Sequence, residues 1–396
     1  MTNTLDPDRL RDRLAAMDST AAVAATSVEF VRSPGRVNLI GEYTDVNDGF
    51  VLPAAIDREI RIGFVRTDDD RIVLHRSDTG DSGEFSLSDL PTRGQGWLDY
   101  AVGTAWALSD AGLRLHGFRG VIETSLPVGA GLSSSAAIEL AIARALLGRD
   151  ADVDPLQLAR ICQRAENQFV GVQSGLMDQF AVACGRSGEA LLLDCRSAEW
   201  RPVALPLAEV SLVVCDTGSP RELAKSEYNV RREQCEAAVA ALQRMDPSVT
   251  SLRDASPAMV QAAEGDGLID AVVARRARHV VSENARVITT AAALEAGDLA
   301  AVADGFRQSH ASLRGDFEVS SPALDTMVEI AVGTPGVIAA RMTGAGFGGC
   351  TINLVRPDAV ERLSEAVERD YATRTGLTPR VFPVMPAEGA GFFEPG

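Results

Sequence analysis

The chain has 396 residues, of which 46% are hydrophobic and 23% charged, so an ordinary globular protein of about two domains is expected. Its net charge of −17 argues against nucleic acid or an anionic membrane surface as a partner, because proteins that bind them carry basic patches. It has no apolar run of about 18 residues and its N-terminus lacks an apolar core, so we expect a cytoplasmic protein without a membrane span or signal peptide.

The first half of the chain mixes helix and strand patterns. Apolar residues at helical spacing predict helices at residues 5–18, 97–111, 133–147 and 155–170. Apolar runs bounded by turn signals predict strands at residues 28–33, 50–56, 59–67, 71–77, 118–127, 189–197 and 211–219.

Long alanine-rich helices dominate the second half. Helices are expected at residues 222–243, 257–264, 268–294, 322–332 and 357–373, and strands at 337–346 and 350–355. Because strands and helices do not alternate regularly, an α+β fold is favoured over a parallel doubly wound sheet. We place the passage between the halves at WRPVALP, residues 200–206, which divides the chain into domains 1–200 and 201–396.

Cysteine and lysine usage limits the chemistry. The six cysteines form no CxxC pair and are widely spaced, so we expect buried free thiols in a reducing compartment, without disulfides or a zinc site. Lys225 is the only lysine, and its context, ELAKSEYN, matches neither a P-loop nor a protein kinase.

Four segments hold the residues with chemical potential. The first, GRVNLIGEYTDVNDG at residues 35–49, combines one cation, Arg36, with several carboxylates and three glycines around a short apolar centre. This density of charge is unusual for a globular core.

The second segment, LPVGAGLSSSAAIELAIARALL at residues 126–147, places two glycines and three serines before a strong helix former. Glycines let the backbone approach a ligand closely, and serines are good N-caps. The free amides and the positive end of the helix dipole favour an anion, and a serine hydroxyl there can hold Mg²⁺. An ordinary capped helix is the alternative, but three consecutive serines exceed what a cap needs.

The third segment, RMTGAGFGGCTINLV at residues 341–355, resembles GxGxxG by loose counting. A dinucleotide-binding fingerprint must run from a strand into a helix, whereas this one runs into the strand pattern TINLV. We therefore reject dinucleotide binding. A glycine hairpin packed against a neighbour is the alternative if the segment is taken alone.

The fourth segment, residues 164–185, contains Glu166 near the end of one helical stretch and Asp178 at the start of another. Asp178 is flanked by Leu176, Met177 and Phe180, so it is expected to be partly buried and to need a partner, for which Arg36 is the natural candidate. Together, the segments supply a phosphate loop, oxygen ligands for magnesium and a carboxylate with an arginine. These are the components of phosphoryl transfer without a P-loop.

The motifs resemble those of the galactokinases, in the GHMP small-molecule kinase superfamily. GRVNLIGEYTDVNDGFVLP resembles the galactokinase signature, LPVGAGLSSSAA the ATP loop of the superfamily, and RMTGAGFGGC its third motif. SGLMDQ, SEYNVRREQCE and SHASLRGDFEVSSPALD also match, so the resemblance runs from about residue 30 to about residue 355. It implies a two-domain GHMP kinase fold with the active site in the interdomain cleft.

The resemblance also implies an activity and its residues. It implies a galactokinase that uses ATP, with Mg²⁺ as cofactor, to phosphorylate the anomeric C1 hydroxyl of galactose, as a monomer or weak homo-oligomer. It assigns Arg36 and Asp178 as the catalytic pair, and Ser135 and Glu166 as the Mg²⁺ ligands. The implied sugar contacts are Glu42, Tyr43, Asp45 and Tyr228. The implied ATP-binding residues are Gly129, Ala130, Gly131, Leu132, Ser133, Ser134 and Ser135.

The chain departs from the family pattern at two positions of the signature. Where the family usually reads GEHTDYN, this chain reads GEYTDVN, with Tyr43 and Val46 in place of histidine and tyrosine. Because the aromatic bulk has moved by three positions, we expect a paired exchange of volume in which the two side chains share one space. A kinase for another galacto-configured sugar, or a sensor that binds sugar and ATP without catalysis, are the alternatives.

Overall fold

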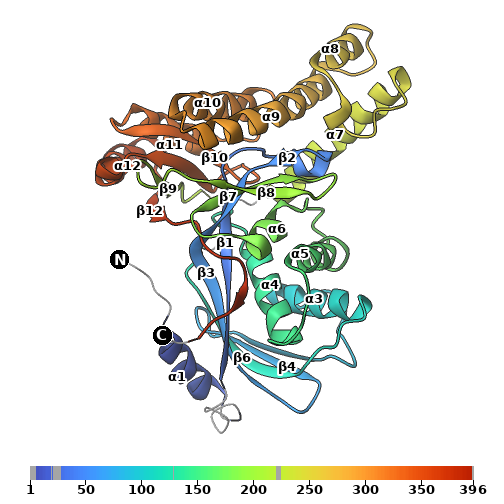
Figure 1. Cartoon of the computed structure of the whole chain (residues 1–396), viewed down its shortest axis with the longest axis vertical. Coiled ribbons are helices and arrows are strands. Elements are labelled where there is room, and N and C mark those ends of the chain that lie inside the picture. The colour runs from blue at the N-terminus through green and yellow to red at the C-terminus, as the bar shows by residue number, and fades with distance from the viewer. Residues whose placement is uncertain (1–5, 19, 21–27, 128, 220–223, 395–396) are drawn as a thin grey trace.

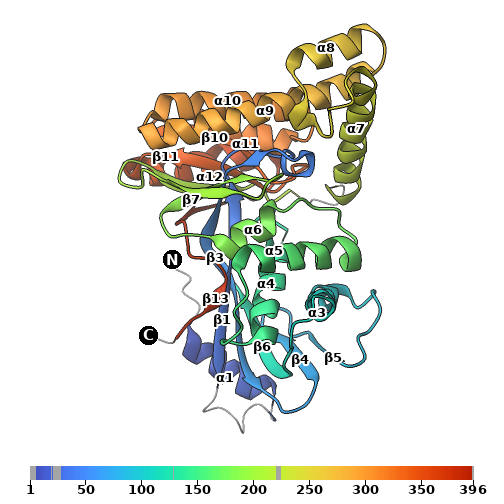
Figure 2. The same ribbon diagram turned by 45° about the vertical axis from the view of Figure 1, so that its right-hand side comes forward.

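The computed structural model describes residues 6–18, 20, 28–127, 129–219 and 224–394. Figures 1 and 2 show two parts stacked along the long axis of the molecule: a lower part built on a large sheet, and an upper part roofed by long helices. The expected α+β fold is confirmed. In the part of the chain that the structure describes, none of the helices is both long and apolar enough to cross a membrane.

The lower sheet has the strand order β13-β1-β3-β6-β4-β5, with β4 and β6 parallel and the other neighbours antiparallel. Helices α3 to α6 lie on one side of this sheet and α1 on the other (Figure 1). The strands are β1 (Glu29–Asn38), β3 (Pro53–Arg66), β4 (Arg71–Arg76), β5 (Ser82–Ser86), β6 (Phe118–Thr124) and β13 (Gly391–Phe392). The helices are α1 (Pro7–Met17), α3 (Asp99–Asp110), α4 (Ser134–Leu147), α5 (Pro155–Arg164) and α6 (Met177–Cys184).

The upper part holds an antiparallel sheet of order β10-β11-β9-β12, and a three-stranded sheet of order β2-β7-β8 lies between the two parts. The upper strands are β9 (Ser211–Asp216), β10 (Val337–Thr343), β11 (Cys350–Val355) and β12 (Arg380–Val384). The intermediate strands are β2 (Phe50–Val51), β7 (Glu189–Asp194) and β8 (Trp200–Ala204). The upper helices are α7 (Ala224–Met245), α8 (Pro257–Gly265), α9 (Ala271–Ala296), α10 (Leu299–Gly315), α11 (Pro322–Gly333) and α12 (Val360–Thr375).

Several sequence-based expectations are corrected by the structure. The strands expected at 50–56 and 59–67 largely merge into one long strand, β3, because its central residues stay paired with β1 across a bulge at Pro34 and Gly35. Residues 200–204 of the expected passage at 200–206 form strand β8, paired with β7. Helix α10 and strands β5, β12 and β13 were not expected. The first residue of the helix expected at 5–18 lies outside the described residues.

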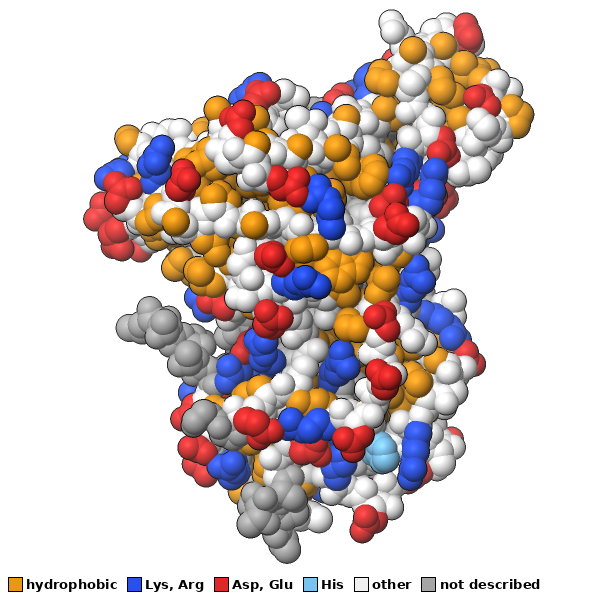
Figure 3. All heavy atoms as spheres, in the orientation of Figure 1, with side chains coloured by type: hydrophobic (Ala, Val, Ile, Leu, Met, Phe, Trp, Pro, Cys, Tyr) orange, Lys and Arg blue, Asp and Glu red, His pale blue; other side chains and the backbone are white. Residues whose placement is uncertain are grey.

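The C-terminal segment returns to the lower sheet. Strand β13 pairs with β1 through Phe392 and Gly391, so the region 201–396 contributes to both parts. The division at residue 200 stays a prediction. Charged side chains of both signs are interspersed over the face in Figure 3. All six cysteines are free and five are buried, as expected.

Candidate active site

The chemistry-bearing segments meet at one cavity of about 360 Å³ between the lower and upper parts. Many of the expected site residues line it: Arg36, Glu42, Tyr43, Asp45, Gly129, Ser135, Glu166, Asp178 and Tyr228. The cavity wall is completed by the third motif through Gly344 and Ala345. Residues 130–134 of the expected ATP loop do not line the cavity itself.

Arg36 and Asp178 form the expected pair at the centre of this cavity. Arg36 lies near the end of β1, and its Nε and Nη2 donate to Oδ1 and Oδ2 of Asp178 at 2.8 and 2.9 Å. Its Nη1 donates to the carbonyl of Gly131 at 2.7 Å, which fixes the guanidinium beside the glycine loop. The arginine is 5% exposed and the aspartate 25%, so the carboxylate faces the cavity while the arginine supports it from below. This two-pronged geometry is the strong form of an arginine–carboxylate contact.

The glycine loop turns sharply into α4. Gly129, Gly131 and Ser133 all have positive φ, at 74°, 80° and 59°. Ser133 stands at the N-cap position but makes no capping hydrogen bond; its hydroxyl donates to Asp178 Oδ2 at 2.5 Å instead. The alternative of an ordinary capped helix does not apply to Ser133, because the Asp178 carboxylate competes for its hydroxyl. The amides at the start of α4 are left for an anion, as the helix dipole favours.

Glu166 and Ser135 lie together on the wall of the cavity. Glu166 belongs to a single π-helical turn, Ala165–Val170, of the kind that often marks a functional site. Ser135 donates to its carboxylate, and so do Ser174 Oγ at 2.5 Å and Gln179 Nε2 at 2.9 Å. Burial raises the pKa of Glu166, so the charged form benefits from an added cation. Two adjacent side-chain oxygens on the wall of one cavity fit the preference of Mg²⁺ for a few protein oxygens.

Asp45 lies in a short 3₁₀ turn, Asp45–Asn47, at the edge of the cavity. It packs so closely on Gly175 that a Cβ there would lie 2.0 Å from Asp45 Oδ2, which explains the glycine. Burial, followed by the nearby charge of Asp178, raises the pKa of Asp45 to about 6. When ionised, the Asp45 carboxylate can accept hydrogen bonds from hydroxyl groups in the cavity.

Glu42 is fixed from the upper part of the molecule. Its Oε2 accepts from Nη2 of Arg341, a fully buried residue of β10, and its Oε1 accepts from the amide of Gly344 at 3.1 Å. Arg341 also donates to the carbonyl of Leu39 at 2.8 Å. Burial raises the pKa of Glu42, and the charge of Arg341 opposes that shift. The pair therefore ties the signature loop to the third motif.

Tyr43 and Val46 do not share one space. Tyr43 is 4% exposed, packs on Tyr228 and Phe317 with ring centroids 5.1 and 4.5 Å away, and donates its hydroxyl to the carbonyl of Ala345 at 2.6 Å. Val46 lines a different cavity of about 440 Å³ on the other side of Asp45. The expected exchange of volume between the two positions is not supported, because they face different cavities.

Sequence reasoning overlooked the supporting residues. Arg341, Ser174 and Gln179 each hold a site carboxylate. All three stand inside or beside motifs that were noticed, RMTGAG and SGLMDQ, and their polar side chains among apolar neighbours were an available signal. The side chain of Lys225 lies outside the described residues.

The chain is similar to known protein families and solved structures. The model for the GHMP kinases N terminal domain matches residues 99–186, and the GHMP kinases C terminal model matches residues 290–373. The galactokinase galactose-binding signature matches residues 21–65. A mevalonate kinase from Methanococcus jannaschii has the same fold, with a TM-score of 0.63 and 17% identity over 91% of this chain and 99% of its own. The fold and the four segments at the cavity define a GHMP kinase.

More similar proteins narrow the assignment. A galactokinase from Roseiflexus sp. (strain RS-1) is 45% identical over 91% of this chain and 92% of its own length, and one from Chloroflexus aurantiacus is 42% identical with the same coverage. The crystal structure of Lactococcus lactis galactokinase complexed with galactose has a TM-score of 0.89 and 35% identity, covering 95% of this chain and 98% of that one. The chain belongs to the galactokinase family.

Proposed function

We propose that the chain transfers the γ-phosphoryl group of ATP to the anomeric C1 hydroxyl of galactose, giving galactose 1-phosphate and ADP. The observation that carries the proposal is the shared cavity, in which the signature carboxylates meet the glycine loop and the Arg36–Asp178 pair. The relative solved with galactose supports the choice of sugar. We place the reaction in the cytoplasm, in a monomer or weak homo-oligomer, consistent with the free thiols.

In this proposal, Asp178 orients the attacking hydroxyl. Its carboxylate already accepts from Arg36 and Ser133, which holds it in one orientation. A loose phosphoryl-transfer transition state asks more for positioning than for a strong base. Arg36 places positive charge beside the transferring group.

The glycine loop and the start of α4 bind the phosphates of ATP through backbone amides. Ser135 and Glu166 would hold Mg²⁺, which when bound neutralises phosphate charge. Asp45, Glu42, Tyr43 and Tyr228 form the sugar side of the cavity. Carboxylates accept from sugar hydroxyls in fixed directions, which supplies the selectivity.

An ADP-release assay with a panel of free sugars tests the proposal. We expect turnover with galactose and little with glucose, whose C4 hydroxyl points the other way. Turnover of another galacto-configured sugar but not of galactose would overturn the assignment of galactose as the substrate. Binding of ATP and sugar without ADP release would show a non-catalytic sensor.

Removing the magnesium ligands is expected to weaken metal use. Ser135→Ala and Glu166→Ala should each raise the Mg²⁺ concentration needed for half-maximal rate by about tenfold or more, because each removes one of the protein oxygens. Ser109→Ala, an exposed serine on α3, is the control. An unchanged Mg²⁺ titration in both variants would show that the metal lies elsewhere.

Asp45 is expected to cost stability at neutral pH. Its pKa is raised from 3.8 to about 6, so folded protein holds this proton more tightly than unfolded protein does. The stabilising contribution is complete below the unfolded pKa and is lost as the pH rises through about 6. Asp45→Asn should therefore raise the Tm above the wild-type value at about pH 7 but not at about pH 4. An equal Tm difference at both pH values would contradict the assigned pKa.

The effect of replacing Tyr43 with histidine is expected to be independent of the residue at position 46. Tyr43→His shortens the side chain and loses the hydrogen bond to the carbonyl of Ala345, so kcat/KM should fall. Because Val46 lines another cavity, adding Val46→Tyr should not restore activity, and the coupling in a double-mutant cycle should stay below about 0.5 kcal/mol. A larger coupling would support the paired exchange of side-chain volume between positions 43 and 46.

A further inference from the structure

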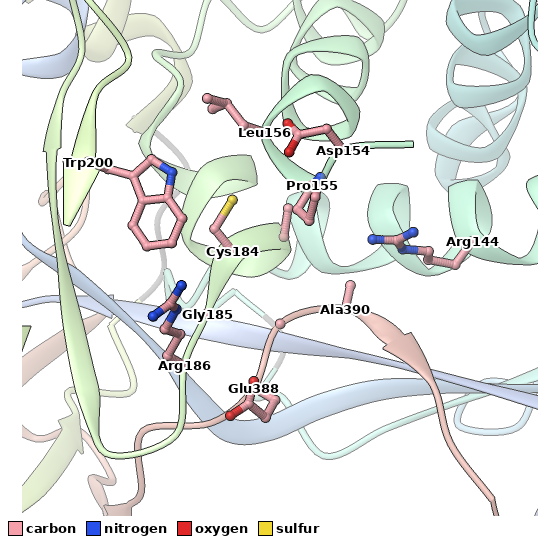
Figure 4. Close-up of a pocket in the computed structure, with 12 residues that line it drawn as sticks. Arg144, Asp154, Pro155, Leu156, Cys184, Gly185, Arg186, Trp200, Glu388 and Ala390 are labelled. Carbon is pink, nitrogen blue, oxygen red and sulfur yellow. The ribbon is translucent and has the colours of Figure 1, made fainter. Parts of the chain in front are cut away.

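A second cavity, of about 320 Å³, lies in the lower part of the molecule (Figure 4). Its walls come from the last turn of α4, the start of α5, the end of α6, strand β8 and residues 388–390 of the C-terminal segment. The galactokinase reaction assigns no role to it. Its size is within the range of small-molecule sites.

Arg144 of α4 projects into this cavity (Figure 4). Its Nε is buried without a hydrogen-bond partner among the described residues, and no carboxylate there forms an ion pair with it. Burial lowers the pKa of Arg144, and the groups that oppose this shift are the thiols of Cys162 and Cys184. Burial raises the pKa of Cys184 to about 12, so that thiol is uncharged at neutral pH. A partly buried cation without an ion-pair partner is costly, and a bound anion would remove the cost.

The carboxylates of the cavity are already engaged with backbone amides. Asp154 caps α5 by accepting from the amide of Gln157 at 3.0 Å, and Glu388 accepts from the amide of Ser187 at 3.0 Å. A second cation, Arg186, enters from the opposite side in Figure 4, with its guanidinium 5.1 Å from the ring centroid of Trp200. The cavity thus offers two guanidinium groups and an aromatic ring to one ligand.

We propose that this cavity binds the oxyanion group of a small metabolite between Arg144 and Arg186, with the body of the ligand against Trp200. Guanidinium forks match the geometry of carboxylate and phosphate groups, and an aromatic ring accepts an apolar or sugar face. The shared chemistry is the oxyanion, supplied by a phosphate ester or by a carboxylic acid.

This site is separate from the catalytic cavity. Both α4 and α6 begin at the catalytic cavity, near Ser135 and Asp178, and run toward the second cavity with Arg144 and Cys184. Arg144 follows Ser135 by nine residues of one helix, or about 14 Å along its axis. A ligand of the second cavity is therefore not a substrate in its reactive position.

Calorimetric titration of the full chain tests the proposal. Inorganic phosphate and citrate are titrated separately, each with saturating galactose and ADP to occupy the catalytic cavity. We expect saturable binding of at least one probe, accompanied by a change in tryptophan fluorescence that is lost in Trp200→Phe. Binding of phosphate alone would identify a phosphate ester as the ligand class, and binding of citrate alone a carboxylic acid.

Two arginine variants make the test specific. Arg144→Met should weaken the binding of the probe by about tenfold or more. Arg149→Met, which removes the same charge just beyond α4 from an arginine paired with Glu394, should leave the affinity within about twofold. In the absence of anions, Arg144→Met should melt no lower than the wild type, because the arginine has no protein partner to lose. Neither probe saturating up to about 10 mM, or equal affinity in Arg144→Met and wild type, would overturn the proposal.

Discussion

Replacing Asp178 with asparagine is expected to lower kcat by about 10²–10⁴-fold while ATP binding persists. The amide keeps the shape of the side chain but loses the charge that Arg36 grips at 2.8 and 2.9 Å. The amide nitrogen of the asparagine is a donor and would face the donors of Arg36 and Ser133. The attacking sugar hydroxyl therefore loses the carboxylate that orients it. Steady-state kinetics at saturating galactose and ATP, with ATP affinity measured by calorimetry, give both quantities.

Ser133→Ala provides the matched comparison for Asp178. It removes one hydrogen bond to the carboxylate and leaves the charge and the Arg36 contact in place. Its kcat should fall less than that of Asp178→Asn. Retention of more than about a tenth of the wild-type kcat in Asp178→Asn would remove Asp178 from the catalytic step.

Arg341→Met is expected to lower the free energy of unfolding by about 3–5 kcal/mol. The change leaves the buried Glu42 carboxylate without its ion-pair partner. It also removes the hydrogen bond that Arg341 donates to the carbonyl of Leu39. Glu283, whose Oε1 is 4.0 Å from the same guanidinium, loses a favourable charge as well. Urea denaturation followed by circular dichroism measures the effect.

Two further variants separate charge burial from loss of packing at Arg341. Adding Glu42→Gln to Arg341→Met should recover part of the lost stability, since no stranded charge remains at that position. Arg369→Met removes an exposed arginine paired with Asp370 and should leave the stability nearly unchanged, because solvent screens an exposed ion pair. A loss below about 1 kcal/mol in Arg341→Met would show that the buried pair is not what ties the signature loop to the third motif.

The contact that sequence reasoning predicted best spans 142 residues. Asp178 stands among apolar residues, so it had to be partly buried and needed a cation, and Arg36 was the cation in the densest polar motif. The contact between Arg341 and Glu42 spans 299 residues and was not predicted. The run VIAARMT reads as a strand, and a strand pattern does not reveal which partner lies opposite a single buried arginine.

Helix α10 shows a second limit of sequence reasoning. Its buried face includes Val302, Phe306 and Leu313, at helical spacing, but also Ser309 and His310. Those two polar residues are buried because Ser309 donates to Glu283 and His310 contacts Asp325. Their partners lie on other helices and cannot be recognised from the sequence around α10. The two polar residues therefore interrupted the apolar pattern, and the helix was not predicted. The hydrogen bond of Ser133 was missed for the same reason, since its partner Asp178 is 45 residues away.

The identity of the product tests the proposed reaction most directly. Purified chain is incubated with galactose, ATP and Mg²⁺, and the products are followed by phosphorus and proton NMR. We expect ADP and one sugar phosphate, whose phosphorus couples to the anomeric proton, formed in equal amounts. Phosphorylation at another carbon, or ADP formation without a sugar phosphate, would contradict the proposed transfer to the anomeric hydroxyl.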